Sequence, residues 1–435
     1  MKSSNVTAAI TLTKMIVLIG MAVWMSGCAA ALASPAPLAD PDDSPAARAI
    51  ALSLTGSPGD PVFIKSYGPA DSDGSGILEG MAYLYDNALA AIALTAGGKH
   101  EDARRIADAI VYAQEHDRWY TDGRLRNAYA PGDPRSPSGS LSERGEEFAL
   151  LPGYYDDEAQ SWQEDYYAVS TATGNMGWAL LALCRVGENA PDPDRDRYIQ
   201  AARRLGEFLL TLESPTGGFF AGYEGWEHSE TKATYLSTEH NIDLVAAFGA
   251  LGRLTGDGRW QGAADSARRF VMSMYDSRQH CFYTGTLTDG TTVNTGVMPL
   301  DTNTWAVLAL GDEAPDPRGT LAYIEEHFSY GEGFDYQSRE QGGGVWFEGT
   351  GQVCVAYAFM GESARYTSLL AYLRSQATDG ALPSADRDGL STGFSDGSGQ
   401  ALSYGRRMHL GAGAWLAFAE LGYNPFDGLY YAPAP

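Results

Sequence analysis

Residues 239–254 read EHNIDLVAAFGALGRL, a polar start followed by an apolar run that is rich in Ala and Leu. Five other stretches share this layout: 85–94 (YDNALAAIAL), 174–183 (GNMGWALLAL), 301–310 (DTNTWAVLAL), 347–360 (FEGTGQVCVAYAFM) and 406–421 (RRMHLGAGAWLAFAEL). A helix that is apolar on all sides is typically buried. The sequence therefore predicts six buried helices, at spacings too irregular for a short solenoid repeat.

Helices with one polar face lie between these runs. Their apolar spacing follows the helical period in five segments: 101–115, 195–213, 259–275, 318–328 and 363–376. A sixth such helix is missing after the last buried run, and residues 44–55 can supply it, with Ser44 as the cap and Pro45 in the first turn. A closed double ring, in which the first helix joins the last, satisfies both sets of helices. An open array of hairpins is the alternative.

Long segments rich in Gly and aromatic residues connect the polar-faced helices to the next buried ones. They cover 216–238, 280–300 and 330–349, and their composition favours turns and short β-hairpins. Loops of this length on one face of a rigid ring are where a binding site is usually built.

The N-terminal residues have the form of an export signal. Residues 1–33 contain two lysines and an apolar stretch, 15–24, that is too short to span a bilayer. Residues 25–28 (MSGC) resemble a bacterial lipobox, so we expect Cys28 to carry a lipid anchor in the cell envelope. Cleavage before Ser34, which would give a secreted or periplasmic protein, is the alternative.

The rest of the chain is acidic and has no second long apolar run. A tether rich in Pro and Asp (34–43) precedes a single expected domain, 44–435. The formal net charge of −25 excludes nucleic acid as a partner and argues against a polyanionic substrate. Cys184 and Cys354 lie in apolar helical runs and are expected to be buried thiols.

Six helical hairpins in this order resemble the (α/α)6 toroid superfamily of six-hairpin glycosidases, which also contains polysaccharide lyases and N-acylglucosamine 2-epimerases. The resemblance covers residues 44 to about 425 and implies an all-α toroid with an active site at the mouth where the inner helices begin. It does not identify a particular family, and fold alone does not give function.

Four acids stand at the predicted starts of the buried helices: Asp86, Glu239, Asp301 and Glu348. Cleavage of a glycosidic bond needs one protonated and one ionised carboxyl. We expect these four residues to be catalytic, with Glu239 or Glu348 as the acid and Asp86 or Asp301 activating water. The alternative for each acid is a helix cap that complements the helix dipole.

Further residues around these acids are candidates for substrate binding. In 235–243 (YLSTEHNID), Glu239 and Asp243 share a helix face, so their like charges raise a carboxyl pKa unless His240 or Lys232 neutralises them. Aromatic rings stack on the apolar faces of sugars. The complete set of predicted substrate-binding residues is His240, Asn241, Asp243, Tyr85, Trp178, Trp226, Tyr235, Asn303, Trp305 and Trp346.

The hypothesis that follows is an exported glycoside hydrolase acting on an oligo- or polysaccharide, with the inverting mechanism usual for the superfamily. The alternatives are a 2-epimerase or lyase, in which His240 or His409 moves the proton, and a non-catalytic glycan-binding envelope lipoprotein. The sequence contains no phosphate loop, dinucleotide fingerprint or zinc signature, so we expect no cofactor and no metal. Membrane contact is expected only through the lipid anchor, and the oligomeric state stays open.

Overall fold

The computed structural model describes residues 44–69, 78–338, 343–395 and 401–431. The export signal, Cys28 and the 34–43 tether lie outside the described residues. The described residues belong to one compact unit. Among the described helices, none combines the length and the apolar character needed to cross a bilayer.

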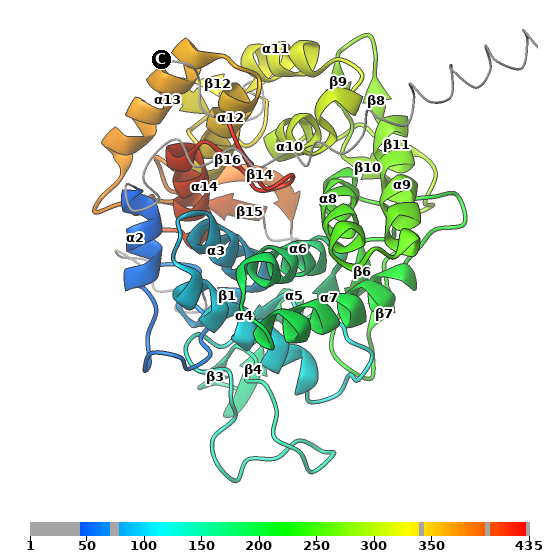
Figure 1. Ribbon diagram of the computed structural model, residues 1–435, viewed down its shortest axis with the longest axis vertical. Coiled ribbons are helices and arrows are strands. Elements are labelled where there is room, and N and C mark those ends of the chain that lie inside the picture. The colour runs from blue at the N-terminus through cyan, green and yellow to red at the C-terminus, as the bar shows by residue number, and fades with distance from the viewer. Residues whose placement is uncertain (1–43, 70–77, 339–342, 396–400, 432–435) are drawn as a thin grey trace, which may run out of the picture. The chain divides into compact units, whose positions relative to one another are not determined.

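Six buried helices form the inner ring. They are α3 (Leu84–Ala96), α6 (Thr173–Asn189), α8 (Thr238–Thr255), α10 (Leu300–Leu310), α12 (Phe347–Phe359) and α14 (Leu410–Leu421). Each helix packs against the next one along the chain, and α14 packs against α3, which closes the ring (Figure 1). The structure therefore has the predicted all-α (α/α)6 toroid fold.

The outer helices cover the ring with one apolar face each. They are α2 (Pro45–Leu52), α4 (His100–Glu115), α7 (Asp194–Leu210), α9 (Gly258–Ser273), α11 (Pro317–Phe328) and α13 (Ser363–Gln376). The predicted partner of the last inner helix is confirmed, because α2 packs on α14. Ser44 caps α2, and both its hydroxyl and the backbone N–H of Ala46 donate to buried Glu420, at 2.7 and 3.1 Å.

Local sequence signals set the helix ends. The Ser237 hydroxyl accepts the backbone N–H of His240 at the start of α8, and Gly256 ends the helix in the left-handed conformation that Gly adopts without strain. The sequence predicted that the last inner helix begins at Arg406, but it begins at Leu410. Met408 and His409 are still extended and pair with Pro383 and Tyr67, respectively.

The connecting segments carry short strands, as expected. The antiparallel pairs are β1–β2 (Ala82–Tyr83, Ala128–Tyr129), β3–β4 (Gly153–Asp156, Ser161–Glu164), β8–β9 (Tyr275–Asp276, Cys281–Phe282), β10–β11 (Gly285–Thr286, Val293–Asn294), β12–β13 (Ser329–Tyr330, Gly333–Phe334), β14–β15 (Leu390–Ser395, Ala401–Tyr404) and β16–β17 (Tyr423–Asn424, Leu429–Tyr430). One sheet has three strands, β5–β6–β7 (Thr171–Ala172, Gly222–Glu224, Thr231–Lys232). Short helices complete the segments: α5 (Tyr166–Val169), η2 (Leu78–Gly80) and η3 (Gly311–Glu313).

The core lies between and inside the two rings. Nearly every residue of the inner helices is buried, including the free thiols of Cys184 and Cys354, which confirms their predicted burial. Cys281 on β9 is also a buried free thiol. Large buried side chains such as Trp260 and Trp415 fill the space between the helices.

Candidate active site

The second residue of each inner helix occupies the same level of the ring. These residues are Tyr85, Gly174, Glu239, Asp301, Glu348 and Gly411. Three neighbouring helices, α8, α10 and α12, thus supply three carboxylates at one end of the ring. On the other side, α6 and α14 supply glycines beside Tyr85.

A polar residue two positions further on fixes this register. The amide of Asn241 accepts the backbone N–H of Phe219 (2.8 Å) and donates to its carbonyl (3.1 Å). Asn303 forms the same pair of bonds with Phe282. Both amides tie a loop to its helix, and the predicted substrate contacts of Asn241 and Asn303 stay predictions.

The same arrangement recurs in two other helices. Asn87 binds both backbone polar groups of Ile64, and the Thr350 hydroxyl accepts the backbone N–H of Phe334. In α3 the residue two positions before Asn87 is Tyr85, and Asp86 lies between Tyr85 and Asn87. Asp86 therefore stands one residue out of register with the other three acids.

His409 lies between two of the carboxylates. Its Nε2 is 3.3 Å from Asp86 Oδ1, and its Nδ1 is 3.5 Å from Glu348 Oε2. All three side chains are buried, with exposed fractions of 2% to 7%. Burial acts to lower the pKa of His409, but the carboxylates of Asp86 and Glu348 act more strongly, and the pKa is raised above its usual value.

Tyr85 connects this group to the ring interior. Its hydroxyl donates to Glu348 Oε1 at 2.6 Å and accepts the indole N–H of Trp415 at 3.2 Å. Burial and the Glu348 charge hold the pKa of Tyr85 well above its usual range. The phenol therefore stays protonated and keeps donating to the carboxylate.

The other carboxyls hold their protons more tightly than usual. Burial, followed by the charges of Asp301 and Glu348, raises the pKa of Glu239 well above its usual value. Burial raises the pKa of Asp301 to about 7 and that of Glu348 to about 7. At neutral pH this end of the ring therefore holds protonated and ionised carboxyls together, which general acid–base catalysis requires.

His240 and Asp243 lie against α6. A Cβ added to Gly174 would meet the His240 ring at 2.5 Å and Asp243 Oδ2 at 3.2 Å. Burial lowers the pKa of His240 to about 4. The imidazole is thus neutral and does not neutralise Glu239. Lys232 does not either, since its ammonium donates to the carbonyl of Thr211.

One turn deeper, tryptophans fill the ring. Trp178, Trp305 and Trp415 pack around Phe426, with ring centroids 5.0 to 6.5 Å from it. Trp178 and Trp305 are 1% and 2% exposed. They form the floor beneath the carboxylates, and their predicted contact with a sugar stays a prediction.

Trp346 is also part of the core, at 1% exposure, and packs on Tyr336 and Tyr404. Its predicted contact with substrate stays a prediction. The sequence pattern shows aromatic residues beside acids but does not show which face of the helix end they occupy.

Tyrosines surround the carboxylates, and most were not predicted. The pKa of Tyr67, Tyr336 and Tyr404 is raised by burial and by the charges of the site acids, and these charges also raise the pKa of Tyr167. Tyr235, which was predicted, is half-buried. Its pKa is raised mainly by burial, and the Glu239 charge adds a smaller contribution. The chain has 25 tyrosines, so their abundance was visible in the sequence but not their convergence.

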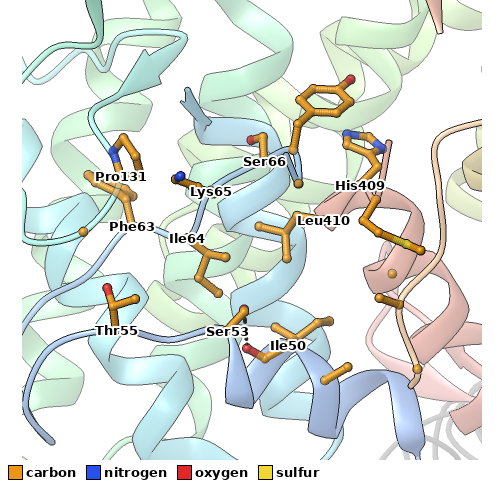
Figure 2. Close-up of a pocket in the computed structure, with 18 residues that line it drawn as sticks. Ile50, Ser53, Thr55, Phe63, Ile64, Lys65, Ser66, Pro131, His409 and Leu410 are labelled. Carbon is orange, nitrogen blue, oxygen red and sulfur yellow. Dashed lines mark hydrogen bonds between the residues drawn. The ribbon is translucent and has the colours of Figure 1, made fainter. Parts of the chain in front are cut away.

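A separate cavity adjoins His409. It has a volume of about 410 Å³ and is lined mainly by apolar side chains, among them Ile50, Phe63, Ile64 and Leu410 (Figure 2). Tyr67 stacks on the His409 ring at 4.5 Å between centroids. None of the four predicted catalytic carboxylates lines this cavity, although Asp86 and Glu348 contact the His409 ring that does.

The chain matches no protein-family model. It also matches no curated protein sequence. Solved structures with the same fold include a wild-type glycosidase (14% identity, 86% of this chain and 95% of the other, TM-score 0.55). An α-mannanase of Bacteroides thetaiotaomicron is also similar (11% identity, 86% of this chain and 92% of the other, TM-score 0.52). So is a cellobiose 2-epimerase of Bacillus thermoamylovorans (10% identity, 85% of this chain and 94% of the other, TM-score 0.55).

These similarities establish the fold. The chain has the six-hairpin glycosidase-like toroid, a class that contains both glycosidases and sugar epimerases among its solved members. At 10% to 14% identity they do not identify the reaction.

Proposed function

We propose that the chain is a glycoside hydrolase that cleaves an oligo- or polysaccharide with a carboxyl acid/base pair. The observation that carries this proposal is the convergence of Asp86, Glu239, Asp301 and Glu348 at one end of the ring. The pKa values of Glu239, Asp301 and Glu348 are raised, so protonated and ionised carboxyls coexist near neutral pH.

Glu239 is the proposed general acid. It is the least buried of the four, because the other three side chains are 2% to 6% exposed while Glu239 is half-buried. Its pKa is held well above the usual value by burial and by two neighbouring carboxylates. It therefore keeps a proton at neutral pH and can pass it to the leaving oxygen.

Glu348 is the proposed base. The Tyr85 hydroxyl donates to it, and His409 lies 3.5 Å away, and both contacts favour its ionised form against the effect of burial. An ionised Glu348 can take the proton from an attacking water. Attack by water on the face opposite the leaving group would give the inverted product.

Two variants separate these roles. Glu239→Gln should lower the hydrolysis of a natural glycan by about 10²–10⁴-fold but spare a dinitrophenyl glycoside, whose leaving group needs no proton. Glu348→Gln should lower both, and azide should restore turnover of the dinitrophenyl glycoside. Equal loss on both substrates for Glu239→Gln would remove it as the acid.

A sugar epimerase or isomerase is the second candidate. His409 between Asp86 and Glu348 supports it, because a histidine held by carboxylates can carry a proton to and from a carbon next to a carbonyl. In this case His409→Asn would abolish the reaction, and the glycosidic bond would stay intact.

Export and the lipid anchor on Cys28 are likewise proposed, on the sequence signal alone. The prediction is that a bacterial host incorporates a labelled fatty acid into the full chain and not into Cys28→Ala. Equal labelling of both would contradict the anchor, and secretion of an unlabelled chain beginning at Ser34 would favour the alternative cleavage.

A further inference from the structure

The exposed aromatic side chains are gathered in one part of the molecule. Among the residues that the structure describes, every large aromatic side chain with an exposed fraction above 36% falls between positions 119 and 226. They are Trp119, Tyr154, Tyr155, Trp162, Tyr166, Tyr167 and Trp226. Exposed aromatic residues concentrated in this way indicate an interaction surface.

This surface is continuous with the carboxylates. Tyr167 is 52% exposed, and its hydroxyl accepts the side-chain N–H of Asn175, the third residue of the inner helix α6, at 3.4 Å. The charges of Glu239 and Asp86 also contribute to its raised pKa. Its neighbour Tyr166 contacts Trp226, with the ring centroids 5.1 Å apart. The surface therefore begins at the end of the ring where the acids lie and extends away from it.

The β3–β4 hairpin extends the surface further. Tyr155 and Trp162 face each other across the two strands and are 54% and 58% exposed. Residues directly opposite in an antiparallel pair project from the same face. We call Tyr155, Trp162, Tyr166, Tyr167 and Trp226 the aromatic platform.

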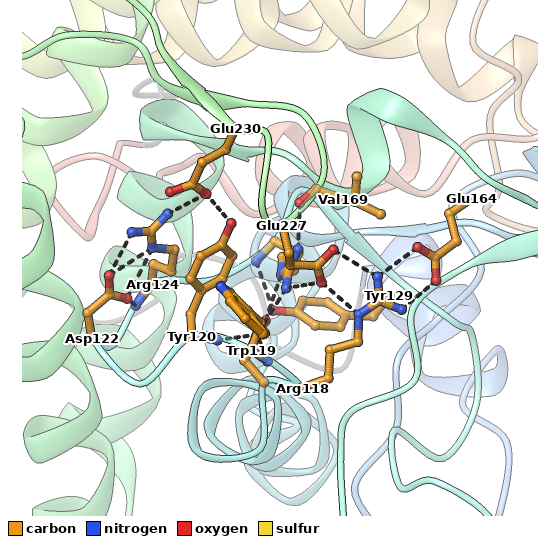
Figure 3. Close-up of polar contacts among 12 residues, drawn as sticks. Arg118, Trp119, Tyr120, Asp122, Arg124, Tyr129, Glu164, Val169, Glu227 and Glu230 are labelled. Carbon is orange, nitrogen blue, oxygen red and sulfur yellow. Dashed lines mark hydrogen bonds and ion pairs between the residues drawn. The ribbon is translucent and has the colours of Figure 1, made fainter. Parts of the chain in front are cut away.

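Two arginines join the segments that carry the platform. Arg118 binds both oxygens of Glu164, two residues after Trp162, at 2.6 and 2.7 Å. It also binds Glu227, which follows Trp226, at 2.6 Å (Figure 3). The hairpin and the loop that carries Trp226 are therefore fixed to the same guanidinium.

Arg126 completes the connection and is fully buried. It binds Asp117 and Glu227, each at 2.6 Å, and donates to the carbonyl of Val169 at the end of α5. Helix α5 carries Tyr166 and Tyr167. We call Arg118, Arg126, Asp117, Glu164 and Glu227 the arginine clamp.

We propose that the aromatic platform binds successive sugar units of an extended, uncharged glycan whose scissile bond lies at the carboxylates, and that the arginine clamp positions the platform. Separate rings on rigid segments fit a chain of pyranoses, each of which offers an apolar face to one ring. The clamp uses its charges internally, so it has no free cation to offer an anionic sugar. This inference rests on the proposed function and adds the substrate class.

The local charge favours an uncharged chain over an acidic one. The hairpin tip carries Asp156, Asp157 and Glu158, of which Asp157 and Glu158 are exposed, and the chain as a whole has a net charge of −25. A uronic-acid polymer would be repelled at this surface.

The test measures binding in the catalytically inactive Glu239→Gln background, by affinity electrophoresis in gels that contain soluble starch, yeast mannan, mixed-linkage β-glucan or polygalacturonate. At least one neutral polysaccharide should retard the protein. Trp162→Ala and Trp226→Ala should each weaken that binding about tenfold, which corresponds to about 1.4 kcal/mol. Leu287→Ala is the matched control, because Leu287 is 46% exposed and lies outside the platform.

The clamp is tested by Arg118→Met, which should weaken binding to the same polysaccharide as much as Trp162→Ala does. Arg118→Lys keeps the charge without the bidentate geometry and should recover only part of the affinity. Unchanged binding in Arg118→Met would show that the clamp does not position the platform.

Other outcomes overturn the platform itself. These are the absence of binding to any neutral polysaccharide, unchanged binding in the two tryptophan variants, and preferential retardation by polygalacturonate. Dimerisation that is lost in Trp162→Ala would assign the surface to a second copy of the chain. Binding without any hydrolysis by the wild type would refute the proposed function and leave the platform standing.

Discussion

The hydrogen bond from Tyr85 to Glu348 gives the sharpest prediction for the pH dependence of catalysis. In the wild type, kcat/KM should rise as Glu348 ionises with a pKa of about 7 and fall at higher pH as Glu239 loses its proton. Tyr85→Phe removes a donor that lies 2.6 Å from Glu348 Oε1 without changing the packing volume. The ionised form of Glu348 loses this bond, so its pKa must rise.

The size of this shift follows from the strength of the bond. A hydrogen bond to a charged group contributes about 1.5–3 kcal/mol. One pKa unit corresponds to about 1.36 kcal/mol. The acidic limb of the kcat/KM profile should therefore move to higher pH by about 1–2 units.

The assay is kcat/KM from pH 4 to 10 on a single substrate, for the wild type, Tyr85→Phe and the control Tyr83→Phe. Tyr83 is a suitable control because it is also half-buried, and the Glu348 charge does not contribute to its raised pKa. A movement of the alkaline limb instead would show that Glu348 is the acid. If neither limb moves, Glu348 does not titrate in the catalytic step and the assignment is refuted.

Three further variants probe the ring and its supports. Gly411→Ala places a Cβ 2.8 Å from Asp86 Oδ1 and 3.1 Å from Glu348 Oε2, which displaces these carboxylates. In initial-rate assays kcat should therefore fall at least about tenfold, while the ring stays folded. Arg126→Met leaves buried Asp117 without its cation and leaves Glu227 with Arg118 alone. The variant should lower the free energy of unfolding by about 3–5 kcal/mol in urea titrations, and a loss below about 1 kcal/mol would contradict the buried clamp. Glu420→Gln weakens the contacts that hold α2 to α14 and should cost about 1–3 kcal/mol, and faster exchange of α2 amides should accompany this loss.

The ring itself could be predicted from the sequence because burial leaves a strong pattern. Runs such as DTNTWAVLAL are apolar on all sides, and only a buried position accommodates them. Ser44, Pro45 and Ser237 carry local capping signals that do not depend on the rest of the fold. The start of α14 was misplaced because Met408 and His409 pair with segments far away in the sequence.

The interior of the site was less predictable. Glu239, Asp301 and Glu348 share the second position of their helices, and the Asn or Thr two residues later marks this register, so a closer comparison of the helix starts would have separated them from Asp86. The burial of Trp178 and Trp305 depends on contacts with Trp415 and Phe426, which lie more than 100 residues further along the chain. The clamp formed by Arg118 and Arg126 joins loops more than 100 residues apart and leaves no local pattern.

The most direct test of the central claim is a proton NMR time course in D2O, with the wild type and Glu239→Gln acting on the neutral polysaccharide that the protein binds. The account predicts new reducing ends in the wild type, formed first as the anomer inverted from the substrate, and a rate about 10²–10⁴-fold lower in Glu239→Gln. Deuterium at the carbon next to the reducing carbon, with every glycosidic bond intact, would contradict hydrolysis and establish an epimerase or isomerase. Undiminished hydrolysis by Glu239→Gln would remove the carboxyl pair on which the account rests.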